Sequence, residues 1–160
     1  MSFFENFKEL IKNPIKYKSF LFSKLPMALV AGLKVVSLEQ EGAVVEVYYK
    51  WLNKNPFRSI YFAVLSMAAE LSTGVLCFGN IYGKTPGVSM LITGLKASFH
   101  KKAVGRIRFT CNDGLKIKQA IDEAYATGEG QVLECTSKGF NENNEVVAEF
   151  IFIWSIKLKK

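Results

Sequence analysis

The segment that most restricts the fold is a stretch near the middle of the chain that is apolar on nearly every side of a predicted helix. It spans residues 55–75 and reads NPFRSIYFAVLSMAAELSTGV. At 100° per residue, Ser59, Ser66, Glu70 and Thr73 lie within about 40° of one direction, and almost all other side chains of the helix are apolar. A helix with so narrow a polar stripe is normally buried. We therefore expect the rest of the chain to enclose this helix.

Glu70 is the charged residue on this stripe. A buried Glu is rare unless it is paired or has a function. Loss of water around its carboxyl would raise the pKa towards the range of a general base. The alternative is a Glu70 at the edge of the helix, exposed or bonded to a backbone group. The residues alone leave both interpretations open.

The segment before the helix predicts a second chemical feature. Ser59 has the residue type of a helix N-cap, which would leave free backbone N–H groups in the first turn. Such groups can stabilise a carbonyl oxygen that gains negative charge. The alternative is an ordinary capped turn.

The remaining periodicity predicts a single α+β domain over residues 1–160, with a mostly antiparallel sheet of about six strands curled around the long helix. The expected elements are an N-terminal helical extension over residues 1–30 that is interrupted at Pro14, strands over 33–40, 43–50, 88–101, 104–110, 131–140 and 145–157, and a helix over 115–126.

Charge and cysteine content restrict the function less than the helix does. The net charge of +7 favours anionic partners, but Lys and Arg are spread along the chain without a nucleic-acid motif. Cys77, Cys111 and Cys135 are far apart and only one His is present, which predicts reduced buried thiols and no metal site. The first residues contain Glu5 where a signal peptide would be apolar, so we expect a cytoplasmic protein. The lysine-rich N-terminal helices suit a lid packed on the domain, with a membrane-surface helix as the alternative.

Three segments resemble the hotdog-fold acyl-CoA thioesterase superfamily, in particular its PaaI-like branch and an uncharacterised group close to it. NPFRSIYFAVLSMAAELSTG resembles the central helix of these proteins, LKASFHKKAVGRIRFTC a strand, turn and returning strand, and GFNENNEVVAEFIF the final hairpin. Together the resemblance covers roughly residues 33–157. It implies a hotdog fold: a curved antiparallel sheet wrapped around a long central helix.

The resemblance also implies an activity and a site. Glu70 lies where the family has an acidic residue that acts as general base or nucleophile on the thioester. Asn55 matches a polar position near the thioester, and the N–H groups around Tyr61 and Phe62 would bind the carbonyl oxygen. The pocket is expected to contain Ser59, Tyr61, Phe62, Ser66 and Thr73.

The expected substrate is a fatty or aromatic acyl group on coenzyme A or on an acyl-carrier protein, and no cofactor is needed. Phosphates of coenzyme A would be held by Arg58, Lys101, Lys102 and Arg106, each of which is otherwise a solvated surface charge. Sites of this family lie between subunits, so the resemblance implies a homodimer or a dimer of dimers.

The sequence departs from the family at the start of the helix. Many relatives have His-Gly-Gly there, where this chain has IYFA at residues 60–63. Glycine lets a substrate approach the backbone closely, whereas Tyr61 and Phe62 add bulk. A non-catalytic hotdog module that binds acyl-CoA or a lipid is therefore the alternative function. A hydratase is a weaker one, because it would rely on His100, which we interpret as a surface or hydrogen-bonded residue.

Overall fold

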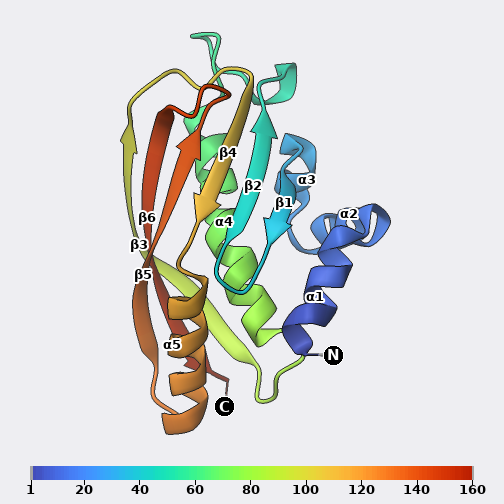
Figure 1. The fold of residues 1–160 in the computed structure, drawn as a ribbon, viewed down its shortest axis with the longest axis vertical. Helices are drawn as coiled ribbons and strands as arrows, with labels where there is room; N and C mark the ends of the chain where they lie inside the picture. The colour runs from blue at the N-terminus through green and yellow to red at the C-terminus, as the bar shows by residue number, and fades with distance from the viewer. Residues whose placement is uncertain (1, 160) are drawn as a thin grey trace.

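A computed structural model of the chain describes residues 2–159, so the first and last residues of the predicted domain lie outside it. The elements are α1 (Phe3–Lys12), α2 (Pro14–Lys24), α3 (Pro26–Ala31), β1 (Lys34–Leu38), β2 (Ala43–Tyr48), η1 (Trp51–Asn53), α4 (Phe62–Ile81), β3 (Val88–Phe99), β4 (Arg106–Cys111), α5 (Gly114–Thr127), β5 (Gln131–Phe140) and β6 (Val146–Leu158). The strands form one six-stranded sheet in the order β1-β2-β4-β5-β6-β3, and every neighbouring pair is antiparallel. The sheet curves around α4 (Figure 1). This is the predicted hotdog fold.

The central helix α4 is the core of the molecule, as its apolar surface predicts. Ala68, Ala69 and Leu76 are fully buried, and residues of β2 and β4 such as Val45 and Phe109 belong to the same buried cluster. By length and composition α4 could also cross a membrane, but most of that apolar stretch is buried inside the fold. The hydrophobic surface of α4 is therefore that of a core helix.

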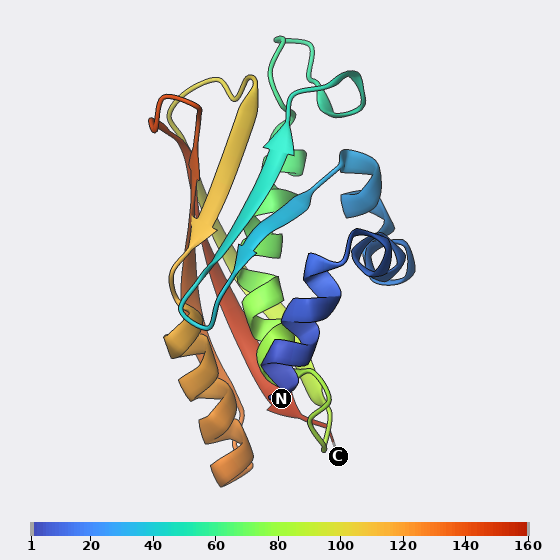
Figure 2. The same cartoon turned by 45° about the vertical axis from the view of Figure 1, so that its right-hand side comes forward.

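The N-terminal helices cover the side of α4 that the sheet leaves open (Figure 2). Phe7 of α1 and Leu21 of α2 are almost completely buried. Asn13 separates the two helices: its side chain accepts hydrogen bonds from the N–H groups of Ile15 and Lys16, and Pro14 occupies the first turn of α2. The predicted interruption is confirmed, and so is the prediction of a lid packed on the domain.

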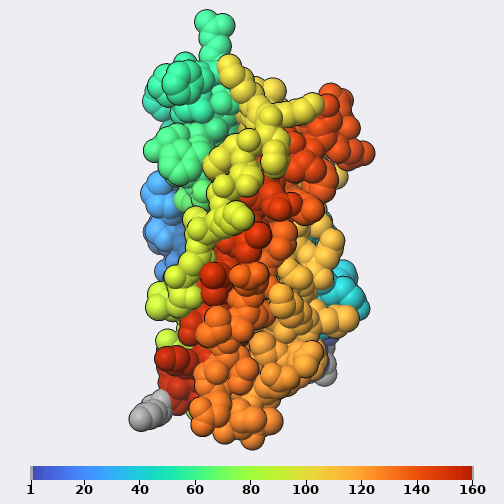
Figure 3. Space-filling view, turned by 90° about the vertical axis from the view of Figure 1, so that its left-hand side faces the viewer, coloured from blue at the N-terminus to red at the C-terminus, as the bar shows by residue number. Residues whose placement is uncertain are grey.

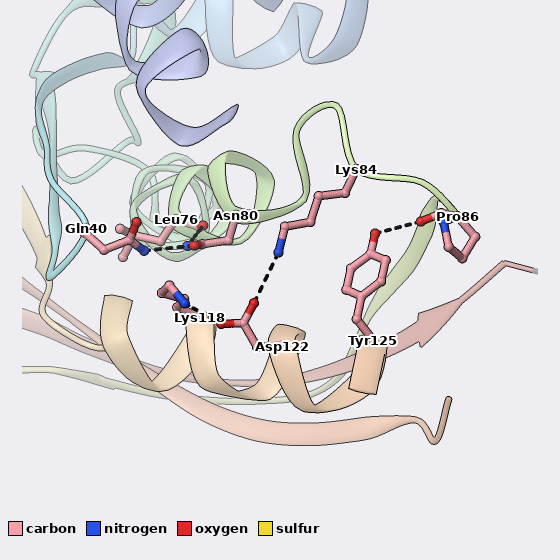
Figure 4. A network of polar contacts seen from close by, with 8 residues as sticks. All are labelled: Gln40, Leu76, Asn80, Lys84, Pro86, Lys118, Asp122 and Tyr125. Atoms are coloured by element: carbon pink, nitrogen blue, oxygen red, sulfur yellow. Dashed lines mark hydrogen bonds and ion pairs between the residues drawn. The ribbon is translucent and has the colours of Figure 1, made fainter. Parts of the chain in front are cut away.

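Polar contacts hold the C-terminal end of α4 in place (Figure 4). The Gln40 side chain, after β1, donates to Asn80 Oδ1 at 2.8 Å. In the loop after α4, Lys84 pairs with Asp122 of α5 at 3.2 Å, and the Tyr125 hydroxyl donates to the Pro86 carbonyl at 2.6 Å. These bonds fix the loop that leads from α4 into β3.

Strand β3 forms one edge of the sheet. It pairs with β6 along its whole length and has no second strand partner among residues 2–159. In Figure 3 it runs as a yellow-green column beside the red β6. Leu91, Leu95 and Phe99 of this strand are each at least half exposed. A long unpaired edge with exposed apolar side chains is suited to pairing with another chain.

One sequence prediction is wrong, two short helices were not predicted, and the prediction for the cysteines is confirmed. Ser59 is not the N-cap of the helix, which begins three residues later with Tyr61 at the cap position and no side-chain cap bond. The reason is that Ile60 is extended and its N–H donates to the Ala103 carbonyl at 2.8 Å. The short helices α3 and η1 were not predicted, because three to six residues carry too little periodicity. The three cysteines are free and buried as expected, and burial raises their thiol pKa values, to about 11 for Cys111 and about 12 for Cys135.

Candidate active site

Glu70 lies in the third turn of α4, on the side covered by the N-terminal helices. Its side chain is partly buried and lines a cavity of about 320 Å³. The other walls come from α1, α2, β3 and β6, and apart from Glu70 and Lys24 the lining is apolar or glycine. The carboxyl group is thus partly buried in a mostly apolar environment, which favours the buried one of the two interpretations that the sequence left open.

This environment changes the acidity of the carboxyl. Burial raises the pKa of Glu70 from 4.5 to about 7. Within residues 2–159 its side chain has no ion pair and no hydrogen-bond partner that would oppose this shift. Near neutral pH the group thus exchanges protons readily, as a general base must.

Gly74 lies one helical turn after Glu70 and keeps the space beside the carboxyl open. A Cβ atom at this position would stand 3.0 Å from Glu70 Oε1 and would project into the same cavity. A glycine inside a helix costs roughly 1 kcal/mol relative to alanine. Its presence here is explained by the room that it leaves next to the carboxylate.

The other polar residues of the predicted stripe serve the packing. Thr73 is buried, donates to the Glu70 carbonyl at 2.9 Å and accepts from Trp154 Nε1 at 3.0 Å. It thereby fixes the Trp154 ring, which forms part of the cavity wall. Ser66 donates back to the Phe62 carbonyl at 2.9 Å. Neither Ser66 nor Thr73 lines the cavity of Glu70.

The start of α4 borders a second cavity, of about 500 Å³, which contains Asn55, Ser59, Tyr61 and Phe62. The Asn55 side chain shapes the loop: Oδ1 accepts from the N–H of Phe57 at 2.9 Å, and Nδ2 donates to the Ser59 hydroxyl at 3.0 Å. This loop places the first turn of α4 at the cavity.

The backbone N–H groups at this end of α4 differ in availability. The Tyr61 N–H donates to the Asn53 carbonyl at 2.8 Å, so it is already used. The N–H groups of Phe62 and Ala63 have no acceptor within the described chain. They are the donors that a carbonyl oxygen could use.

The predicted phosphate-binding residues do not all lie together. Lys101 and Lys102 line the second cavity, and Arg58 belongs to its loop, with a left-handed backbone conformation at φ 60°. Lys101 is paired with Glu145, while Lys102 Nζ donates to the Phe57 carbonyl at 3.3 Å. Arg106 instead lies 3.9 Å from the Glu46 carboxylate on β2. His100, interpreted as a surface or bonded residue, lines this cavity as well.

One chain does not bring the two halves of the predicted site together. Glu70 and Tyr61 are nine positions apart on α4, which is about 13 Å along the helix axis. The cavity of Glu70 and the cavity at the helix start share no lining residue.

Sequence reasoning also missed Phe20, Lys24 and Gly74 in the wall around Glu70. A glycine inside an otherwise apolar helix was the signal that could have revealed the last of these.

Known structures share this fold. A Pseudomonas aeruginosa protein of unknown function, described as a probable thioesterase, superposes with a TM-score of 0.75 at 22% identity, covering 92% of this chain and 97% of that one. A Haemophilus influenzae thioesterase gives a TM-score of 0.66 at 9% identity, covering 91% of both chains. The Escherichia coli PaaI protein from the phenylacetic acid degradation operon gives 0.62 at 14% identity, covering 90% of this chain and 95% of that one. No curated protein matches the sequence.

The likeness to these proteins confirms, at the level of the fold, the hotdog resemblance stated from the sequence. Residues 16–155 also match a family described as a domain of unknown function, DUF4442, and this match includes both cavities apart from Phe7. The chain is thus a hotdog-fold protein and belongs to the DUF4442 family.

Proposed function

We propose that this protein hydrolyses an acyl thioester and that Glu70 is its general base or nucleophile. The observation that carries the proposal is a carboxyl group with a pKa of about 7 in an otherwise apolar cavity that has room beside it. Structural and ion-paired carboxylates have low pKa values, whereas catalytic bases are tuned towards neutral pH. Hotdog structures described as thioesterases provide the reaction class.

As a general base, ionised Glu70 would take a proton from water while the water oxygen attacks the thioester carbonyl. The C–S bond then breaks, the thiol leaves with the proton, and the free acid remains. As a nucleophile, Glu70 would form an anhydride with the acyl group and release the thiol, and water would then cleave the anhydride. Both routes put negative charge on the carbonyl oxygen, which needs nearby N–H donors.

The donors would come from a second subunit. If two β3 edges pair antiparallel about a two-fold axis, the Met90 end of one strand lies beside the Phe99 end of the other. Met90 lines the cavity of Glu70, and Phe99 lines the cavity at the start of α4. A β3-paired homodimer would therefore join the two cavities and bring Glu70 towards the free Phe62 and Ala63 N–H groups of the partner.

Coenzyme A is the carrier that best suits the second cavity. Lys101 and Lys102 line it and Arg58 lies in the loop beside it, so positive charge would be near a bound phosphate, once Lys101 exchanges its partner Glu145 for that phosphate. Arg106 is less suited to this role because it does not line this cavity and lies 3.9 Å from the Glu46 carboxylate. An acyl-carrier protein would present a phosphopantetheine phosphate to the same cavity.

The direct test is hydrolysis of acyl-CoA by the purified protein, by Glu70→Gln and by the control Glu134→Gln, which changes an exposed carboxylate on β5. We expect turnover by the wild type and the control, and a loss of at least about 100-fold in Glu70→Gln, the usual range for a missing general base. A Glu70→Gln protein as active as the wild type would contradict the role of Glu70.

A binding module without catalysis is the second candidate. It is favoured by Tyr61 and Phe62, whose rings pack edge to face with centroids 5.0 Å apart at the start of α4, where many relatives have glycine. In that case acyl-CoA would bind with the same affinity to the wild type and to Glu70→Gln, and neither protein would release free thiol.

A further inference from the structure

The cavity of Glu70 is lined by residues from two successive turns of α4. The lining residues on this helix are Glu70, Leu71, Gly74, Val75 and Phe78, of which Glu70, Gly74 and Phe78 follow one another at one-turn intervals. From Glu70 to Phe78 the helix rises by about 12 Å. An extended alkyl chain that begins at the carboxylate could therefore lie parallel to the helix for this distance.

Aromatic rings from the N-terminal helices line this cavity beside Phe78. Phe7 of α1 packs against Phe20 of α2 and Phe78 of α4, with ring centroids 5.8 and 5.3 Å apart, and Phe20 packs against Phe78 at 5.5 Å. All three rings line the cavity. The N-terminal helices that cover α4 in Figure 2 thus supply an end wall that the sheet and α4 alone would not provide.

The near end is bordered by the last residues of α2 and the residue that follows it. Lys24 and Leu25 line both the cavity of Glu70 and a smaller neighbouring one of about 200 Å³ that Glu70 also borders. The carboxylate and the lysine therefore mark the polar end of the space, and the aromatic rings mark its apolar end. A space with one polar and one apolar end is complementary to an acyl group whose carbonyl lies at Glu70 and whose methyl end lies at the rings.

We propose that α1 and α2 form the end wall of an acyl-chain pocket and that the preferred substrate is a saturated, unbranched acyl thioester of about eight to ten carbons. This rests on the proposed function and assigns its substrate class. The volume of about 320 Å³ holds about ten groups of the size of a water molecule, which occupies about 30 Å³ in the liquid. A distance of about 12 Å corresponds to roughly ten carbon–carbon bonds of 1.5 Å in an extended zigzag.

The alternatives fit this space less well. An acetyl or single-ring acyl group would leave part of the apolar pocket without contacts, so its walls would lose dispersion energy. A chain of sixteen carbons would be longer than the roughly 12 Å from Glu70 to Phe78, where the ring of the fully buried Phe7 packs on Phe78. Chain length, rather than a specific polar group, is therefore what the pocket selects.

Two substitutions should change the length of the pocket in opposite directions. Phe20→Ala removes a partly buried ring from the end wall and should lengthen the pocket. Gly74→Leu adds a side chain to a residue that lines the pocket, where the three nearest atoms to the new Cβ belong to the Glu70 carboxyl group, and should shorten it. The matched control is Phe22→Ala, which removes a 74% exposed ring on the opposite face of the same helix.

The experiment measures binding of saturated acyl-CoA from two to sixteen carbons by calorimetry, with all variants in the Glu70→Gln background so that no substrate is consumed. We expect affinity to rise about fourfold per methylene, which corresponds to about 0.8 kcal/mol per buried CH₂, and to level off at eight to ten carbons. The levelling point should move to longer chains in Phe20→Ala, to shorter chains in Gly74→Leu and not at all in Phe22→Ala. Thermal melting shows that each variant is folded.

The outcomes separate this proposal from the proposed function. Affinity that does not depend on chain length, or an equal shift in Phe20→Ala and Phe22→Ala, would overturn the pocket even if wild-type protein hydrolyses acyl-CoA. Conversely, the predicted levelling points in a protein without turnover would support the pocket and refute hydrolysis. If Phe20→Ala does not fold, the levelling point of Gly74→Leu still tests the pocket: a shift to shorter chains would support it, and no shift would overturn it.

Discussion

Glu70 couples folding to pH because its proton affinity differs between the folded and unfolded chain. The folded chain holds the proton up to about pH 7, whereas an unfolded chain with an ordinary Glu pKa of 4.5 has released it. The folded state thus binds more protons between these two values, so Glu70 makes the protein less stable as pH rises from about 4.5 to 7.

This gives a prediction for Glu70→Gln at the residue scale. The amide cannot ionise, so the variant should be more stable than wild type at pH 8, by up to about 3 kcal/mol for a shift of this size. At pH 4.5 the two proteins should differ little. Urea unfolding at both pH values and at one protein concentration measures the difference. Equal stability at pH 8 would show that Glu70 is well hydrated.

At the scale of single residues, the sequence predicted Glu70 but not its surroundings. The narrow polar stripe drew attention to Glu70, because helical periodicity is a local property, but it left open whether the carboxylate is buried or at the edge of the helix. The role of Ser59 was wrong, because the extended conformation of Ile60 depends on a bond to Ala103, far along the chain. The contribution of Phe20 could not be foreseen for the same reason.

At the scale of elements, the N-terminal helices belong to the core. Phe7 of α1 is fully buried and contacts the rings of Phe20, Phe78 and Tyr82. The sequence predicted an N-terminal helical extension, and its lysine residues left a membrane-surface role open. In the structure, the apolar face of α1 that contains Phe7 packs on α4.

We therefore expect Phe7→Ala to destabilise the protein by about 3–5 kcal/mol, as large-to-small changes in a core do. Phe22→Ala, on the exposed face of α2, should change stability by no more than about 0.5 kcal/mol. Chemical denaturation of both variants measures the two values. A cost below 1 kcal/mol for Phe7→Ala would mean that α1 is not held on α4 in solution.

At the scale of the whole molecule, the fold separates the residues that the proposed reaction would use. The sequence predicted the sheet and its helix well, because long strands and helices have strong periodic patterns. It could not predict that Glu70 and the start of α4 open into different cavities. Only the edge position of β3 shows how a second copy would unite them.

A mixed dimer tests this arrangement. Asn55→Ala, which loosens the loop before α4, and Glu70→Gln should each lower activity strongly. Mixing the two variants after dissociation should restore about a quarter of wild-type activity, because half of the dimers are mixed and each contains one intact shared site. No recovery, with mixed dimers demonstrated by mass spectrometry, would place the whole site in one chain.

The central claim is that Glu70, tuned by its cavity, is the catalytic base, and the pH dependence of hydrolysis tests it most directly. With octanoyl-CoA as substrate, kcat/KM of the wild type should rise about tenfold per pH unit below pH 7 and level off above it, since only ionised Glu70 is active. Any residual activity of Glu70→Gln should lack this inflection. An inflection near pH 7 that persists in Glu70→Gln, or a wild-type profile that is flat from pH 5 to 9, would contradict the account.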